Sequence, residues 1–560
     1  MTNKTFALLS LLAAFAAGCG SDTPSQPAVE RTAVDALVIN ANGYTMTNSE
    51  LATFTTMVIN DGKIVAIGDD TVADDYAAAD TADLAGATVL PGLTDAHGHV
   101  SSLGKLRKTL DLAGVASLDA TLGRIASYDA SLGDQQQWLL GRGWNQVLWT
   151  EKRFPTAADL DAIVPDRPIL LNRIDGHAAW ANSRALELAG INDDTADPPG
   201  GRILRDADGK ATGILVDSAM GIVRQAIPAE TADAVREYID TALVELASLG
   251  ITSVHDAGAT ATEIDLYKEL ADAGKMTVRV SAMLGGVPTL EQFETPIVGY
   301  ADDMFEATSV KLYADGALGS RGAAMIEPYS DAKDDTGLLF ATANEMAEYI
   351  QAAHDKGFAA NVHAIGDAAN QTVLDAFAIV NDGKPSTFDD RVEHAQIVTL
   401  EDIERFAELD IIASVQPTHA TSDKNMAEDR VGAERIKGAY AWQRMLDAGV
   451  RMAGGSDFPV EKPEMFDGLF AAVTRQSKDG EPQGGWYPDQ KLNREQTLAL
   501  FSLWAADSVG QADRLGSLET GKYADFIVLD RDYFEIPDDH IWQIQVRQTW
   551  VAGKPVFTAQ

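Results

Sequence analysis

The pattern of hydrophobic and polar residues changes twice along the chain. From about residue 33 to 90, short segments that alternate apolar and polar positions lie between turn signals, which predicts paired β-strands. The same pattern returns from about residue 515 to 560. Between these ends, apolar runs alternate with longer helical segments, which is typical of a parallel sheet with crossover helices. We therefore predict that residues 33–90 and 515–560 form one composite β-sandwich domain, split by a larger α/β domain.

The central region, residues 91–514, contains enough apolar strands for a (β/α)8 TIM barrel. Beyond the first strand, which ends at His97 and His99, the candidates are residues 168–174, 251–255, 278–283, 309–313, 359–363, 391–394, 411–416 and 451–453. Together with the first strand, these make nine candidates for the eight strands of a barrel. The surplus is the run 168–174, because it falls in a segment rich in Trp, Asp and Gly from about residue 111 to 247. The predicted fold class is α/β: a TIM barrel with a small β-sandwich domain formed from both chain ends and an insertion after strand 1.

The N-terminus has the form of an export signal. Lys4 precedes an apolar run from residue 6 to 17, which is too short to span a bilayer. The run ends in Ala-Ala-Gly-Cys at Cys19, and polar residues follow. This resembles a bacterial lipoprotein signal, in which cleavage leaves a lipidated cysteine. We predict a signal peptide over residues 1–19, a flexible tether over 20–32, and a periplasmic or surface lipoprotein in the bacterial cell envelope. An ordinary secretory signal is the alternative.

Charge and cysteine content narrow the function. The chain has 84 acidic and 44 basic residues, a formal net charge of −40, which argues against nucleic acid or an anionic membrane surface as a partner. Its single cysteine excludes an intrachain disulfide and a zinc site made of several thiolates. We expect a small-molecule substrate, contact with the membrane only through the N-terminal lipid, and a possible homo-oligomer.

Histidines and an aspartate follow the ends of several predicted strands. His97 and His99 end the first strand and, being two residues apart, point to the same face. His363, His394 and Asp457 end later strands. The carboxyl ends of all strands meet at one mouth of a TIM barrel, so these five side chains converge there. Imidazoles and a carboxylate suit a divalent first-row metal such as zinc.

Longer motifs surround these residues: KLYADGALGSR at 311–321, HAIGD from His363, EHAQ around His394, GSDFPV around Asp457, DGHAAWAN at 175–182 and DPPGG at 197–201. With these motifs the chain resembles the amidohydrolase superfamily, and within it the YtcJ-like (amidohydrolase-3) branch, over nearly the whole mature chain. That branch includes enzymes resembling N-substituted formamide deformylases.

The resemblance implies a metal centre and a reaction. It implies that His97, His99, His363, His394 and Asp457 bind one or two divalent ions, commonly zinc, and that Lys311 is carboxylated by carbon dioxide to bridge two ions. An unmodified Lys311 paired with Asp315 is the alternative. The implied reaction is hydrolysis of a non-peptide C–N bond in a small N-acyl or N-formyl amine by metal-bound hydroxide, with Asp457 carrying the proton. An esterase or lactonase, a cyclic amidase, or a non-catalytic ligand-binding surface lipoprotein are the alternatives.

Further polar and aromatic residues are candidates for substrate contact. His177 and His419 could orient the substrate or polarise its carbonyl, and His177, Arg142, Trp144 and Arg321 could bind it. The alternative for the histidines is hydrogen bonding at the barrel rim, and for the tryptophan it is ordinary packing. His255 ends a predicted strand as well and could support a metal ligand.

Overall fold

The computed structural model describes residues 31–47, 50–133, 138–174, 176, 178–198 and 201–560. The predictions for the signal peptide, for Cys19, for the tether up to residue 30 and for His177 lie outside the described residues. Within these ranges, no helix is long and apolar enough to cross a membrane.

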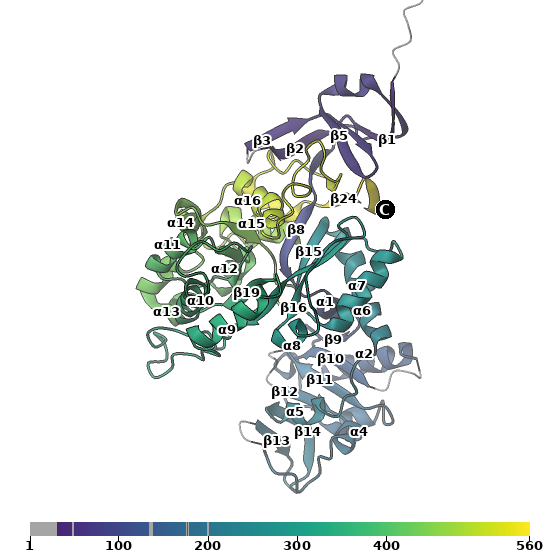
Figure 1. Ribbon diagram of the computed structural model, residues 1–560. Helices are drawn as coiled ribbons and strands as arrows, with labels where there is room; N and C mark the ends of the chain where they lie inside the picture. The colour runs from purple at the N-terminus through teal and green to yellow at the C-terminus, as the bar shows by residue number, and fades with distance from the viewer. Residues whose placement is uncertain (1–30, 48–49, 134–137, 175, 177, 199–200) are drawn as a thin grey trace, which may run out of the picture.

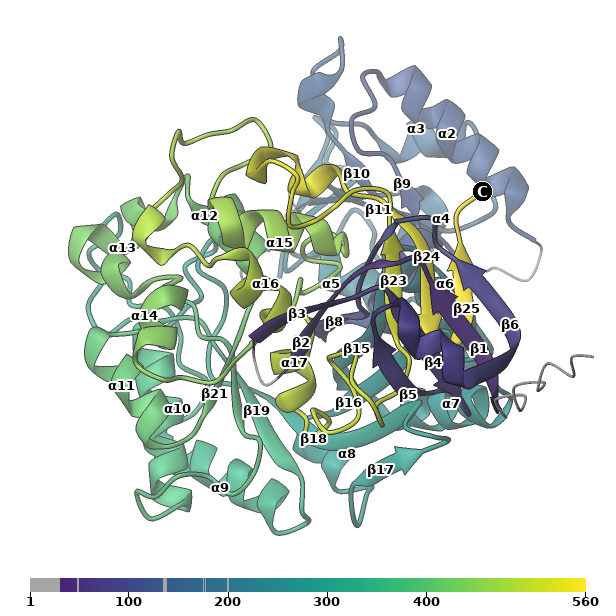
Figure 2. The same cartoon turned by 90° about the horizontal axis from the view of Figure 1, so that it is seen from above.

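Eight parallel strands form the central barrel (Figures 1 and 2). In order around the sheet they are β8 (Leu93–Gly98), β15 (Ile251–Ala259), β16 (Arg279–Gly285), β18 (Phe305–Tyr313), β19 (Ala359–Ala364), β20 (Arg391–His394), β21 (Ile412–Val415) and β22 (Met452–Gly454). Each is paired in parallel with the next. The predicted TIM barrel is confirmed.

The segment after β22 closes the barrel against β8. Its contacts are single backbone hydrogen bonds rather than a regular ladder: the amide of Asp457 donates to the carbonyl of His97 (2.7 Å), and the amide of His99 donates to the carbonyl of Phe458 (2.8 Å). The closure therefore places the last predicted site residue beside the first two.

Helices surround the barrel, and several of them begin at a side-chain cap. They include α1 (Val100–Arg107), α6 (Ala232–Ser248), α7 (Ala261–Asp272), α9 (Ala343–His354), α10 (Asp367–Val380), α11 (Leu400–Glu408), α12 (Pro417–Asp423), α14 (Trp442–Asp447), α15 (Met465–Thr474), α16 (Arg494–Leu500) and α17 (Leu503–Asp507). Thr260 and Thr342 start α7 and α9 with capping boxes completed by Glu263 and Glu345. The strands and helices share one continuous apolar core.

Both chain ends build the β domain, which lies at the top of Figure 1. One sheet has the order β5 (Lys63–Gly68), β4 (Thr56–Asn60), β1 (Thr32–Ile39) and β6 (Tyr76–Asp83), and the other has β25 (Lys554–Thr558), β24 (Val546–Val551), β23 (Phe526–Leu529), β7 (Thr88–Pro91), β2 (Asn42–Thr47) and β3 (Glu50–Phe54). Antiparallel pairing of β23 with β7 joins the two ends of the chain. Buried Met57 and Ile59 of the first sheet pack in one cluster with Val89, Phe526 and Val528 of the second.

The insertion after strand 1 has a sheet and a core of its own, and lies on the far side of the barrel from the β domain in Figure 1. Its sheet has the order β13 (Gly201–Arg205), β14 (Ala211–Asp217), β12 (Ala178–Ala181), β11 (Ile169–Arg173), β10 (Leu139–Trp144) and β9 (Leu110–Asp111). The surplus strand of the sequence is β11 of this sheet. Trp144, Trp149 and Trp180 pack together in the core of the insertion, with ring centroids 6.1 to 6.4 Å apart.

Candidate metal centre

Three histidines at the mouth of the barrel are held by hydrogen bonds at Nδ1. The acceptor for His97 is Glu393 Oε2 (2.5 Å), for His99 it is the carbonyl of Ala257 (2.8 Å), and for His394 it is Gln416 Oε1 (2.8 Å). In each ring Nδ1 is therefore the hydrogen-bond donor, and Nε2 is the nitrogen that faces the other residues of the mouth. Imidazole rings held through Nδ1 in this way present Nε2 for binding a metal ion.

Asp457 lies between the histidines. Its Oδ1 is 3.2 Å from His99 Nε2 and 3.7 Å from His97 Nε2, and its Oδ2 is 3.6 Å from His419 Nε2. Burial opposes ionisation of this carboxyl, but the hydrogen bond from His99 and the nearby imidazoles lower its pKa to about 2. Asp457 is therefore an anion beside the ring nitrogens of these histidines.

Two groups of donor atoms at this mouth are compact enough to hold a divalent cation. One is His97, His99 and Asp457, and the other is His394, His419 and Asp457; within each group the donor atoms lie within 4.8 Å of one another. Nitrogen and carboxylate donors at this spacing fit zinc and similar first-row ions. Asp457 belongs to both groups, so its two oxygens can face two ions at once.

His363 lies beside these groups. Its ring centroid is 4.5 Å from that of His394, and its Nε2 is 3.4 Å from Asp315 Oδ1. The oxygens of Asp315 accept hydrogen bonds from the amides of Ala324, Ile365 and Gly366. Asp315 is thus used to hold the loops after β18 and β19. The alternative in which it pairs with Lys311 is wrong for this structure.

Lys311 ends inside the cluster. The residue is only 1% exposed, and its Nζ is 3.0 Å from His97 Nε2. Burial lowers the pKa of the amine to about 8, although Glu393 and Asp457 favour its charged form. Lys311 is therefore a buried side chain among the candidate ligands and not a surface cation.

The backbone around these ligands is held in unusual conformations. His394 and Asp457 have φ angles of 77° and 61°, in the left-handed region that residues other than glycine rarely adopt. Asp95 fixes the turn before Asp457: its Oδ1 accepts from the amides of His97 (3.1 Å) and Ser456 (3.0 Å), and its Oδ2 accepts from Ser456 Oγ (2.6 Å). Burial raises the pKa of Asp95 to about 6.

Comparison with known proteins identifies the family to which the chain belongs. The sequence profile of the Amidohydrolase family matches residues 80–557. The chain belongs to the amidohydrolase family. It is 32% identical to the YtcJ amidohydrolase of Bacillus subtilis (strain 168) over 89% of this chain and 95% of the relative. It is 29% identical to an N-substituted formamide deformylase of Arthrobacter pascens over 93% and 97% of the two chains.

A solved structure is similar as well. An uncharacterized metal-dependent hydrolase from Pyrococcus furiosus superposes with a TM-score of 0.76 at 29% identity, over 89% of this chain and 99% of that one. The protein is thus a metal-dependent hydrolase that acts on carbon–nitrogen bonds, and its candidate metal-binding groups lie at the barrel mouth where its histidines gather.

Three residues at the mouth of this amidohydrolase were not singled out from the sequence: Glu393, Asp95 and Tyr313. Tyr313 is 49% exposed, and its ring centroid is 5.5 Å from that of His363 and 5.2 Å from Lys311 Nζ. It follows Lys311 by two residues on β18, and the alternation of side chains along a strand could have indicated it. Its exposed ring beside buried ligands makes it part of the wall of the mouth.

Unlike the predicted metal ligands, the residues predicted to bind substrate do not gather in one place. Trp144 is fully buried in the insertion, where its Nε1 donates to the carbonyl of Leu171 (2.8 Å), so it is a core residue and has no surface to offer a substrate. Arg142 is exposed on β10. Arg321 forms an ion pair with Asp331 (2.9 Å) on the loop after β18. Among the described residues, no hydrogen bond or ion pair joins these three side chains to the histidine cluster.

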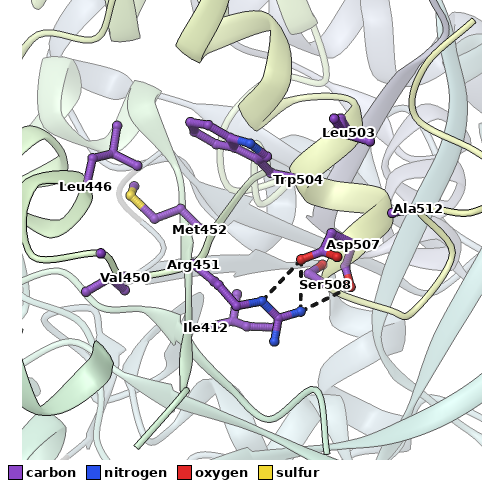
Figure 3. A pocket seen from close by; sticks show the side chains of 11 residues that line it. Ile412, Leu446, Val450, Arg451, Met452, Leu503, Trp504, Asp507, Ser508 and Ala512 are labelled. Atoms are coloured by element: carbon purple, nitrogen blue, oxygen red, sulfur yellow. Dashed lines mark hydrogen bonds and ion pairs between the residues drawn. The ribbon is translucent and has the colours of Figure 1, made fainter. Parts of the chain in front are cut away.

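A cavity of about 460 Å³ lies at the other end of the barrel (Figure 3). Ile412 and Met452, the first residues of β21 and β22, line it, so it opens at the amino ends of the strands. Its arginine, Arg451, is hydrogen-bonded to Asp507 (2.9 Å). This end of a TIM barrel serves stability, whereas chemistry takes place at the opposite end.

Proposed function

We propose that this amidohydrolase is an exported enzyme that hydrolyses the amide bond of a small N-acyl or N-formyl amine. The observation that carries the proposal is the position of Asp457, which is shared by two groups of histidine donors at the mouth of the barrel. The similarity to an N-substituted formamide deformylase supports the choice of an N-formyl or N-acyl amine over other amides.

In this proposal His97, His99, His363, His394 and Asp457 hold one or two divalent ions, most simply zinc. Lys311, as a carbamate formed with carbon dioxide, would add a further oxygen ligand to this set. Its Nζ already lies 3.0 Å from His97 Nε2. Carboxylation would replace a buried amine by a carbamate, whose single negative charge is shared by two oxygens and would offset part of the charge of a second ion.

The residues of the chain then divide the chemistry. A divalent ion held here would supply a Lewis acid that lowers the pKa of water toward about 7. Asp457, ionised at neutral pH, is placed to accept a proton from the attacking water and to return it to the departing amine. His419, 3.6 Å from Asp457 Oδ2, orients that carboxylate or polarises the substrate carbonyl. Tyr313 lines the space above the ligands, and Arg142, Arg321 and His177 stay predictions for substrate contact.

The proposal of export rests on the N-terminal sequence. Lys4, the apolar run 6–17 and Cys19 suit a signal peptide whose cleavage leaves a lipidated cysteine. The test is to express the full chain in a bacterium with labelled palmitate. Label in the wild-type protein but not in Cys19→Ser supports a lipoprotein of the cell envelope, and an unlabelled wild type contradicts it.

The first experiment on the enzyme is metal per chain, by elemental analysis of protein lacking residues 1–20 and purified without chelator. Two zinc ions per chain support the carbamate on Lys311, and one ion supports the hydrolase without the bridge. No ion after addition of zinc and bicarbonate overturns the proposal. Amine release from N-formyl and N-acetyl derivatives of one amine, with an ester of the same shape as control, then tests the reaction: cleavage of the ester alone overturns the assignment to an amide.

A further inference from the structure

Two buried charges occupy the interior of the barrel directly below the histidines. Arg391 and Glu393 alternate with Val392 along β20, so both side chains point toward the barrel axis. Each is 0% exposed. A charged side chain removed from water in this way is destabilising unless partners satisfy it, so its partners show what it is for.

The two oxygens of Glu393 have different partners. Oε1 is 3.0 Å from Arg391 Nε, which forms the expected buried ion pair. Oε2 is 2.5 Å from His97 Nδ1, and His97 is itself fully buried. A pair formed only to neutralise Arg391 would not need the second contact. Glu393 therefore connects an arginine to a histidine of the candidate metal centre.

The hydrogen bond determines which nitrogen of His97 faces the centre. Since an ionised carboxylate only accepts hydrogen bonds, the proton of His97 is on Nδ1 and the lone pair is on Nε2. That Nε2 lies 3.0 Å from Lys311 Nζ and 3.7 Å from Asp457 Oδ1. His99 and His394 have neutral acceptors, a backbone carbonyl and an amide oxygen. Of these three rings, only that of His97 has an anion as its acceptor at Nδ1, which makes this ring the stronger donor to a cation.

Arg391 is held by residues on its side toward the amino ends of the strands, and so fixes the orientation of Glu393. Its Nη1 donates to His255 Nδ1 (3.0 Å) and to Ser508 Oγ (3.2 Å), and His255 is 1% exposed. Ser508 lines the cavity at the amino ends of the strands (Figure 3). A continuous line of contacts thus runs through the barrel from Ser508 to His97.

We infer that Glu393 is a positioning residue that holds His97 as a ligand through Nε2, with Arg391 keeping its carboxylate in place. The inference rests on the proposed function, since it requires a metal ion at this centre. It assigns to the glutamate before His394 a role in metal affinity that neither the motif nor the chemistry of hydrolysis requires.

The test compares Glu393→Gln with Glu306→Gln in the full-length protein. Glu306 is also a buried glutamate of the barrel, 2% exposed on β18, but it accepts hydrogen bonds from Ser281 (2.8 Å) and Gln511 rather than from a histidine. Zinc affinity is measured by competition with a chromophoric chelator, and the ligand field by the visible absorption of cobalt(II) protein. We expect Glu393→Gln to bind zinc 10- to 100-fold more weakly, with altered cobalt bands, and Glu306→Gln to stay within twofold of wild type.

Two further measurements distinguish a loss of zinc affinity from a loss of the fold. Raising free zinc should restore the activity of Glu393→Gln, because its loss is one of occupancy. The double variant Glu393→Leu/Arg391→Met removes both charges, and it should keep the fold while keeping the weakened zinc affinity. Zinc affinity of Glu393→Gln within twofold of wild type, or an equal loss in Glu306→Gln, would overturn the inference. A wild-type protein that binds no metal would instead overturn the proposed function, so the two failures are distinct.

Discussion

The backbone amide of Asp457 donates a 2.7 Å hydrogen bond to the carbonyl oxygen of His97. These residues lie near opposite ends of the barrel sequence, and the hydrogen bond belongs to the closure of the last strand on the first. The same closure brings the Asp457 side chain to 3.2 Å from His99. Assembly of the candidate metal centre and closure of the barrel are therefore one structural event, and a change that disturbs the closure should be seen in the metal content.

Gly455 tests this link. A Cβ at this position would lie 2.6 Å from the amide nitrogen of His97 and 2.8 Å from Asp95 Oδ1, so Gly455→Ala must push the segment before Asp457 away from β8. We expect a stability loss of about 1–3 kcal/mol, and a larger proportional loss of bound zinc and of activity. Metal per chain and the thermal midpoint measure the two effects.

The matched control for Gly455→Ala is Gly123→Ala. Gly123 is exposed on α2 (Leu118–Ser131), and a Cβ there meets nothing within 4 Å. Since alanine favours a helix over glycine, this variant should be as stable as wild type or slightly more so, with full metal. A Gly455→Ala protein with full zinc occupancy would show that closure and metal binding are separable.

Asp457→Asn tests the proposed proton carrier. The amide keeps an oxygen that can face a cation, so we expect most of the metal to remain, while turnover falls by about 10²- to 10⁴-fold because the base is lost. The measurements are metal per chain and kcat on an N-formyl amine. Turnover at the wild-type rate would mean that another group moves the proton.

Histidine ligands should respond differently from Asp457. His97→Ala removes a nitrogen donor and leaves Glu393 and Lys311 without their contacts to this ring. We expect loss of metal together with loss of turnover, whereas Asp457→Asn loses turnover alone. Unchanged zinc in His97→Ala would remove this residue from the ligand set.

The sequence was sufficient for the barrel and for the convergence of its histidines, because both follow from simple periodicities. Apolar runs alternating with helices predict the parallel barrel, and strand ends predict the common mouth. It was insufficient for Glu393, whose role depends on which side chain it meets across the barrel interior. The prediction that Trp144 binds substrate was wrong for a related reason. An aromatic residue beside Gly and Arg looks the same in sequence whether it lines a pocket or packs in the core of an insertion.

A buried ion pair joins the barrel to the β domain. Arg279, at the start of β16, contacts Asp525, just before β23, at 2.6 and 3.1 Å, with side chains 2% and 7% exposed. Removing one partner leaves an unpaired buried charge, so Asp525→Leu should lower the unfolding free energy by about 3–5 kcal/mol. The double variant Arg279→Met/Asp525→Leu removes both charges and should regain most of that loss. Urea unfolding followed by tryptophan fluorescence measures both; a double variant as unstable as the single one would contradict the argument.

Glu306 predicts a specific dependence of stability on pH. Burial raises the pKa of this carboxyl to about 7, although the hydrogen bond from Ser281 acts in the opposite direction. In the unfolded chain a glutamate titrates near its ordinary value of about 4.3. The folded protein thus binds this proton more tightly than the unfolded chain, so the stabilisation from the protonated form is complete below about pH 4 and is lost as the pH rises through about 7.

In Glu306→Gln the side chain at position 306 is an amide, which is uncharged at every pH. Relative to wild type, its unfolding free energy should therefore increase between pH 5 and pH 8, by about 3 kcal/mol at most. The control is Glu345→Gln, an exposed capping-box glutamate whose pKa is lowered by the backbone amide and hydroxyl of Thr342. Above pH 5, Glu345 is ionised in both the folded protein and the unfolded chain. The difference in unfolding free energy between Glu345→Gln and wild type should therefore be constant over this range. Urea unfolding at four pH values from 5 to 8 gives both curves, and a constant difference for Glu306→Gln would mean that Glu306 is already ionised in the folded protein at pH 5.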